Sequence, residues 1–123
     1  DLHKRIEIMN QSDVKLVVSI HQNSFTGESS KGAQVFYHKS SEKGKRLAGI
    51  LQQSIKEKAD KENHRVEKAN ASYYMLRKVS CPIVIVECGF LSNPDEERLL
   101  NDEKYQKKMV EGIAEGIENF LYK

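Results

Sequence analysis

Residues 82–93 read PIVIVECGFLSN, and this stretch decides how the chain folds. Its β-branched run, residues 83–86, is apolar on both faces, which is typical of a strand in the middle of a helix-covered sheet. The carboxylate of Glu87 follows at once, and we expect the strand to end there. An ionised carboxylate is costly to bury without compensation, so Glu87 is a candidate for a cation contact, a metal site or proton transfer.

A second apolar strand, residues 16–20, ends in a polar residue in the same way, with His21. Taken alone, a histidine at this position more often closes a strand than carries chemistry. If the two strands run parallel, however, His21 and Glu87 emerge together at the carboxyl edge of the sheet, where open α/β folds bind their ligands. The sequence therefore predicts a polar site built on these two residues.

The rest of the chain alternates between helical and extended patterns, while residues 61–72 are polar and show no period. The order of elements predicts an α/β layered sandwich in which helices flank a mainly parallel or mixed sheet. The other elements expected are a helix over 2–12, a strand over 32–37, a helix capped by Ser40 or Ser41 and ending near Asp60, a short extended piece over 73–77, a helix beginning at Ser92-Asn93, and a last helix after Asn101-Asp102.

Composition bounds the class of protein. The 123 residues fit one compact domain, and 38% of them are hydrophobic. The formal net charge of +2 comes from lysines interspersed with glutamates, which argues against a nucleic-acid partner. The longest apolar run, residues 81–86, is too short to span a membrane. Cys81 and Cys88 flank a strand and are expected to lie about 20 Å apart, beyond disulfide reach, as free thiols.

Both polar strand ends resemble segments of the zinc-dependent N-acetylmuramoyl-L-alanine amidases. Residues 17–23, VVSIHQN, are similar to that family's SIHAN-type strand, and residues 84–93 contain its ECGFLSN segment. The two matches come in the right order, and residues 32–37 and 74–77 resemble stretches that lie between them in the family. Within the family, the chain looks most like the sporulation amidases that prepare the spore cortex.

The resemblance implies a peptidoglycan hydrolase that cleaves the amide between N-acetylmuramic acid and L-alanine with Zn²⁺ as cofactor. His21 matches the family's second zinc histidine, and Glu87 matches the catalytic glutamate that accepts a proton from the activated water. Asn23 and Arg77 are weaker candidates for substrate contacts, with a local loop bond and an ion pair as the open alternatives. The family also implies a place outside the cytoplasm, in the cell wall or spore cortex, with a signal sequence that is not part of this chain.

In one respect the chain departs from the family pattern. The resemblance implies that residues 1–123 form the catalytic domain without the family's first strand and first helix, which carry the other two zinc ligands. His3, His38 and His64 read as surface histidines rather than as replacements for those ligands. A missing strand would leave a sheet edge open, so self-association or a protein activator stays open as well.

Two other functions remain as alternatives. One is a non-catalytic or degenerate peptidoglycan-binding or regulatory module, which would keep the groove without zinc. The other is a different α/β hydrolase, but Ser24 and Cys88 lack the partner motifs of a nucleophile. Cys88 is expected to point away from Glu87 as a hydrophobic filler, and Gly89 is expected to permit a tight turn.

Overall fold

The computed structural model describes residues 1–23 and 31–123. Its sheet has the order β1-β4-β2-β3, and the strands are β1 (Val17–Asn23), β2 (Gln34–His38), β3 (Lys68–Asn70) and β4 (Ile83–Phe90). β1 runs parallel to β4 and β2 runs parallel to β3, whereas β2 and β4 are antiparallel. The predicted mainly parallel sheet is therefore confirmed, with an antiparallel pair at its centre.

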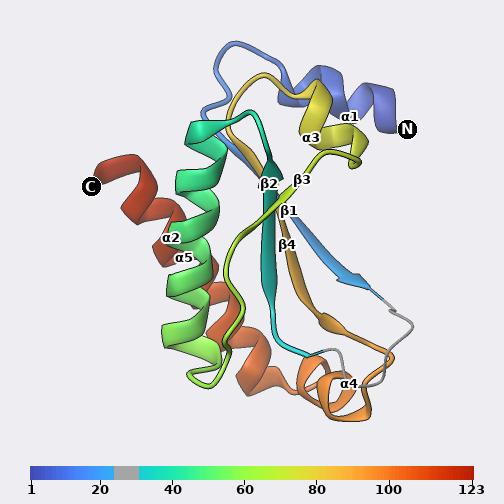
Figure 1. Cartoon of the computed structure of the whole chain (residues 1–123), viewed down its shortest axis with the longest axis vertical. Helices are drawn as coiled ribbons and strands as arrows, with labels where there is room; N and C mark the ends of the chain where they lie inside the picture. Colours follow the sequence, from blue (N-terminus) through green and yellow to red (C-terminus); the bar gives the residue numbers. More distant parts are fainter. Residues whose placement is uncertain (24–30) are drawn as a thin grey trace.

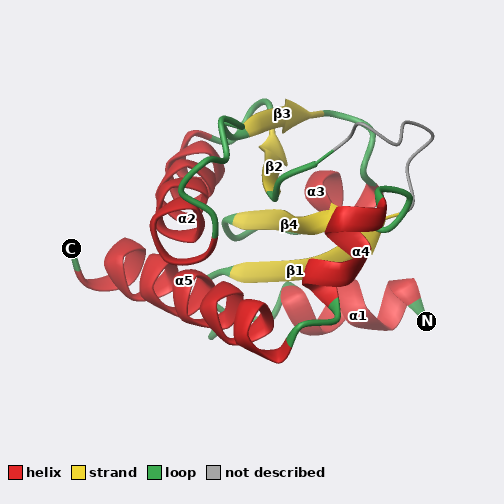
Figure 2. Ribbon diagram, turned by 90° about the horizontal axis from the view of Figure 1, so that it is seen from below, coloured by secondary structure: helices red, strands yellow, loops and turns green. Residues whose placement is uncertain are grey.

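Helices cover both faces of the sheet. α2 (Glu42–Ala59) and α5 (Glu103–Tyr122) lie together on one side, and α1 (Leu2–Met9) and α3 (Tyr74–Lys78) lie on the other (Figure 2). α4 (Pro94–Leu100) lies beyond the end toward which β1 and β4 point (Figure 1). The predicted layered α/β sandwich is confirmed.

The alternation of side chains along β4 divides the apolar residues into two cores. Val84 and Val86 pack with α2 and α5, where Leu47, Leu51 and Ile55 are fully buried. The other core, beneath α1 and α3, is smaller and contains four buried residues, Leu76, Val79, Ile83 and Ile85. β4 contributes side chains to both cores and must therefore be apolar on both faces. This property is the one that predicts a central position in the sheet.

Helix caps agree with the sequence pattern. The Ser41 side chain accepts a hydrogen bond from the Gly44 amide at 2.9 Å and so caps α2, which ends at Ala59 with Asp60 as its C-cap. Asn93 caps α4 by accepting from the amides of Asp95 and Glu96, with Pro94 in the first turn. The predicted starts of both helices are confirmed.

Four local predictions are wrong. The first helix ends at Met9 rather than at residue 12, and the stretch 73–77, expected to be extended, forms most of helix α3. β3 was missed because it is a short, polar strand at the sheet edge, where no apolar alternation is required. Glu87 does not end its strand, since β4 continues to Phe90.

No helix in the described part of the chain is long and apolar enough to cross a lipid bilayer. Cys81 and Cys88 are free cysteines, as expected, the first half-buried and the second buried.

Candidate functional site

The ends of β1 and β4 bring His21 and Glu87 side by side. The two residues pair directly in the parallel register, and paired residues on neighbouring strands point to the same face. That face is the one covered by α1 and α3, because Ile85, two residues before Glu87, belongs to the core under those helices. The predicted juxtaposition of His21 and Glu87 is confirmed.

Glu87 occupies the middle of a polar row. β4 lies between β1 and β2, so Glu87 pairs with His21 on one side and with Gln34 on the other. Its side chain is fully buried, and Oε1 lies 3.4 Å from the Gly89 amide, which donates toward it. A carboxylate that is fully buried near the carboxyl ends of two parallel strands is typical of a group that transfers protons or contacts a metal-bound ligand.

Ser19 orients the imidazole of His21. The two side chains lie two residues apart on the same face of β1, and Ser19 Oγ is 2.9 Å from His21 Nε2. A hydrogen bond to one ring nitrogen fixes the ring and leaves the other, Nδ1, for a ligand. The His21 residue as a whole is partly buried.

The donor chemistry of His21 fits a zinc ion as one ligand, because neutral imidazole is among the ligands that zinc prefers. Within residues 1–23 and 31–123, no three His, Cys, Asp or Glu side chains gather closely enough to hold a metal. His3 is exposed and stacks against Tyr74, His64 is exposed, and His38 Nδ1 lies 2.7 Å from Ser40 Oγ.

Cys88 points to the opposite face of β4, into the core beneath α2 and α5. Burial and, secondly, the neighbouring charge of Glu87 raise the pKa of its thiol to about 11. The thiol is therefore protonated at neutral pH and is a poor nucleophile. This agrees with the interpretation of Cys88 as a hydrophobic filler.

The two weaker candidates lie differently. Arg77 is exposed on α3, with its guanidinium 5.6 Å from the centre of the Tyr74 ring, and α3 lies at the opposite end of the molecule from α4 (Figure 1). The backbone of Asn23 pairs with Phe90 at the end of β1, and its side chain lies outside the described part of the structure. A substrate contact by either residue stays a prediction, as does the role of Ser24, which lies outside the described residues.

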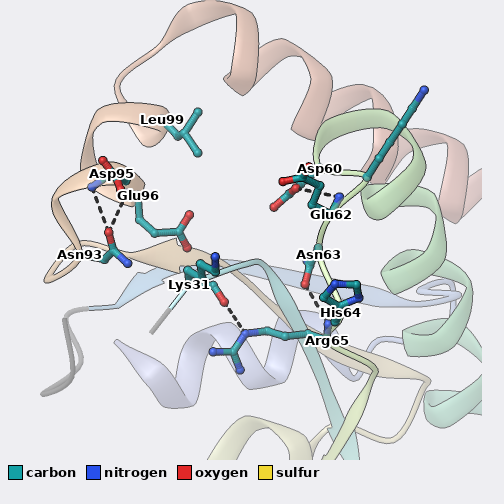
Figure 3. A pocket seen from close by; sticks show the side chains of 11 residues that line it. Lys31, Asp60, Glu62, Asn63, His64, Arg65, Asn93, Asp95, Glu96 and Leu99 are labelled. Carbon is teal, nitrogen blue, oxygen red and sulfur yellow. Dashed lines mark hydrogen bonds between the residues drawn. The ribbon is translucent and has the colours of Figure 1, made fainter. Parts of the chain in front are cut away.

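A pocket of about 870 Å³ lies between the end of α2 and the start of α4 (Figure 3). His21 and Glu87 do not line it. Its walls include Lys31, Asn63, Arg65 and Glu96. Sequence reasoning missed these residues because 61–72 has no period and Glu96 read simply as an acid favourable to the start of a helix.

Glu96 ties the start of β2 to α4. Its side chain is buried, and Oε1 accepts a hydrogen bond from the Gly32 amide at 2.6 Å. Gly32 has a φ of 88°, and a Cβ there would lie 2.8 Å from Asn63 Oδ1, so only glycine fits. Burial raises the pKa of the Glu96 carboxyl, and the hydrogen bond from Gly32 opposes part of that effect.

Gly89 has a different role from the one expected. It lies inside β4, and the positive φ of the described glycines is confined to Gly32, so Gly89 makes no turn that requires its freedom. A Cβ on Gly89 would lie 3.2 Å from Leu100 Cδ1 and 3.3 Å from Glu96 Oε1. Its small size permits the close approach of α4 to β4.

We expect Glu96→Gln to change how stability depends on pH. In the unfolded chain Glu96 ionises near pH 4.5, and in the folded protein it ionises at a higher pH. The folded state therefore binds more protons in this window, and the wild type loses stability as the pH rises through it. Glutamine can still accept the Gly32 bond through Oε1 but carries no charge. Urea unfolding at several pH values should give similar stabilities below pH 4 and a more stable variant at pH 7.

The same experiment with Glu97→Gln serves as the control, because Glu97 is exposed on the same helix. If Glu96→Gln follows the wild-type pH profile, the burial of the Glu96 charge has no thermodynamic consequence.

The sheet topology and the polar row define an α/β protein with a histidine and a carboxylate at the carboxyl edge of two parallel strands. The family model for N-acetylmuramoyl-L-alanine amidases matches residues 1–119. The chain belongs to this family.

Individual relatives agree with that assignment. The germination-specific N-acetylmuramoyl-L-alanine amidase of Bacillus subtilis (strain 168) is 32% identical over 117 residues, which is 95% of this chain and 49% of the relative. The CwlD amidase of Clostridioides difficile, solved in complex with the GerS lipoprotein, is 41% identical with a TM-score of 0.92 and is matched over 98% of this chain and 61% of its own. An N-acetylmuramoyl-L-alanine amidase from Clostridium difficile 630 is 32% identical with a TM-score of 0.89, over 98% and 65% of the two chains. The chain thus spans about half the length of the Bacillus relative.

Proposed function

We propose that this chain is the part of a peptidoglycan hydrolase that carries one zinc ligand and the general base. The reaction is cleavage of the amide between N-acetylmuramic acid and L-alanine, with His21 as the ligand and Glu87 as the base. The observation that carries the proposal is the direct pairing of His21 with Glu87 on one face of the sheet. A metal ligand and a proton acceptor must lie this close to act on one water molecule.

The roles of the two residues follow from their surroundings. When bound, zinc supplies a Lewis acid that lowers the pKa of water and polarises the scissile carbonyl. The hydrogen bond with Ser19 holds the imidazole ring of His21 in place. Glu87 accepts the proton of the attacking water and passes it to the departing amine of L-alanine. The resemblance assigns the other two zinc ligands to the family's first strand and first helix.

The relatives support a narrower role outside the cytoplasm. One of them is named as germination-specific, and another was solved with a lipoprotein. We propose that the substrate is the peptidoglycan of the cell wall or spore cortex and that a protein partner activates the enzyme there. The alternative, a module that binds peptidoglycan without cleaving it, is an outcome of the experiment below.

We test the proposed function with a purified protein that contains this chain together with the family's first strand and first helix, incubated with cell-wall peptidoglycan in the presence of zinc. The expected products are intact glycan strands and peptides with a new amino-terminal L-alanine, detected by mass spectrometry, together with bound zinc in elemental analysis. His21→Ala should lower the zinc content and abolish product formation, because zinc affinity depends on every ligand.

His3→Ala is the matched control, since His3 is exposed and belongs to α1 rather than to the polar row. It should keep both zinc and activity. Peptidoglycan binding without zinc and without peptide release would contradict the hydrolase and support the binding module. Release that survives His21→Ala in full would refute the ligand role of that histidine.

A further inference from the structure

Arg65 reaches the polar row from the loop after α2. Its Nη1 donates to Gln34 Oε1 at 2.9 Å, and its Nε donates to the Lys31 carbonyl at 2.6 Å. Gln34 pairs with Glu87 in the register of β2 and β4, so Arg65 is bonded to a direct neighbour of the buried glutamate. Arg65 also lines the pocket between α2 and α4 (Figure 3).

A bulge in β4 supplies an aromatic platform for this arginine. Two steps along β1, from His21 to Asn23, correspond to three steps along β4, from Glu87 to Phe90. The extra residue turns Phe90 to the face that Glu87 occupies, where strict alternation would have turned it away. The Arg65 guanidinium carbon lies 5.0 Å from the centre of the Phe90 ring, a favourable cation–π distance.

The loop that carries Arg65 is fixed before any ligand arrives. Asn63 is buried, donates to the Ala33 carbonyl at 2.9 Å and accepts from the Arg65 amide at 2.9 Å. The side chain of Arg65 is then held by Gln34, Lys31 and Phe90. Its conformational freedom is therefore largely lost on folding rather than on binding, which favours affinity for a ligand.

The guanidinium still has donors to offer. Of its five N–H groups, two make the hydrogen bonds described above, and Nη2 is used in neither. Among residues 1–23 and 31–123, the ion pairs with a nitrogen–oxygen distance of 4.0 Å or less are Lys58–Glu115 and Arg98–Asp95. Arg65 therefore forms no ion pair with a carboxylate in these residues. Glu96 feels the positive charge of Arg65 but accepts its hydrogen bond from Gly32.

We propose that Arg65 binds a free carboxylate on the peptide side of the scissile amide and so makes the site specific for acidic peptide stems. The inference rests on the proposed function and adds a substrate-binding residue to it. On the sugar side, the lactyl carboxyl is consumed by the amide bond, so negative charge is found on the peptide side. A planar guanidinium held at one edge is the group best suited to receive such a carboxylate.

Two synthetic ligands test the inference, N-acetylmuramoyl-L-alanyl-D-glutamate and the same compound with both carboxyl groups converted to carboxamides. Affinities are measured by isothermal titration calorimetry without added metal, so that turnover does not contribute. The wild type should bind the acid about tenfold more tightly than the diamide, the size expected of one charge-assisted hydrogen-bonded pair. Arg65→Gln should bind both ligands with the affinity that the wild type has for the diamide.

Arg46→Gln is the matched control, because Arg46 also lies over a phenylalanine, Phe120 at 4.7 Å, but on the helical face away from the row. It should discriminate between the ligands as the wild type does. Arg65→Lys is the second variant; it keeps the charge without the planar fork and should retain only part of the preference. Thermal unfolding checks that each variant is folded.

The outcomes separate the two claims. Equal binding of acid and diamide by the wild type, or an unchanged preference in folded Arg65→Gln, would overturn the role of Arg65 and leave the proposed function standing. Binding of neither ligand would count against the proposed function itself, and the inference would fall with it.

Discussion

Glu87→Gln should slow peptide release from peptidoglycan by about a thousandfold, the loss typical of removing a general base. Glutamine has nearly the same size and shape as glutamate but cannot accept the proton of water at neutral pH. Zinc content and peptidoglycan affinity should stay close to wild type, since His21 is unchanged. Initial rates of release of peptides with amino-terminal L-alanine, measured at saturating zinc, provide the comparison.

Stability separates a catalytic from a structural role for the same residue. The Glu87 side chain is fully buried, and an ionised carboxylate costs more to bury than a carboxamide. We therefore expect Glu87→Gln to unfold at the same temperature as the wild type or at a higher one. Glu97→Gln, on the exposed face of α4, should keep full activity. A Glu87→Gln protein that is active, or that is inactive only because it is unfolded, would contradict the general-base role.

Gly112→Leu should lower the free energy of unfolding by about 3 kcal/mol, the upper end of what overpacking usually costs. Gly112 lies where α5 crosses α2, and a Cβ there would lie 3.0 Å from Ile55 Cα and 3.3 Å from the Ser54 carbonyl oxygen. Both contacts are to backbone, so the helices must move apart. That movement would also break the bond from Ser54 Oγ to the Gly112 carbonyl, now 2.6 Å. Urea unfolding at pH 7 measures the change.

The same substitution at Gly49 is its control. Gly49 is on α2, and a Cβ there would meet only the carboxylate end of Glu67, a flexible side chain that can swing away. Leucine is also the better helix former, so Gly49→Leu should be neutral or slightly stabilising. Similar losses at both positions would mean that the close α2–α5 contact at Gly112 is not the cause of the loss.

The fold could be predicted where burial imposes a pattern. Residues 83–86 are apolar because they are buried in a central strand. The caps Ser41 and Asn93 are local features that the sequence shows directly. Elements that depend on distant contacts gave no such signal. β3 is a polar edge strand, and α3 has only Leu76 fully in the core, so neither needs a regular apolar period.

The residues of the site fall into the same two groups, those that the local sequence predicts and those that depend on distant contacts. His21 and Glu87 could be found because each is a polar residue directly after an apolar run, although only the run before Glu87 is buried. Arg65 and Asn63 are brought to the row by tertiary contacts with the start of β2, and nothing in their local sequence indicates that placement. The bulge that turns Phe90 was also missed, because Gly89, the kind of residue that often accompanies a bulge, was expected to make a turn. Near the start of β2, the sequence offers the glycine at position 32 as an indication of special backbone geometry, and its φ is positive in the structure.

The direct pairing of His21 with Glu87 also constrains residues that never touch a substrate. Slipping β1 by a single position along β4 would send the imidazole to the opposite surface of the sheet and leave the carboxylate without its neighbour. What prevents that slip is the fit of valines and isoleucines several positions upstream. Substitutions among these aliphatic residues are therefore expected to abolish the proposed activity while the chain still folds, so a functional screen would group them with His21 and Glu87.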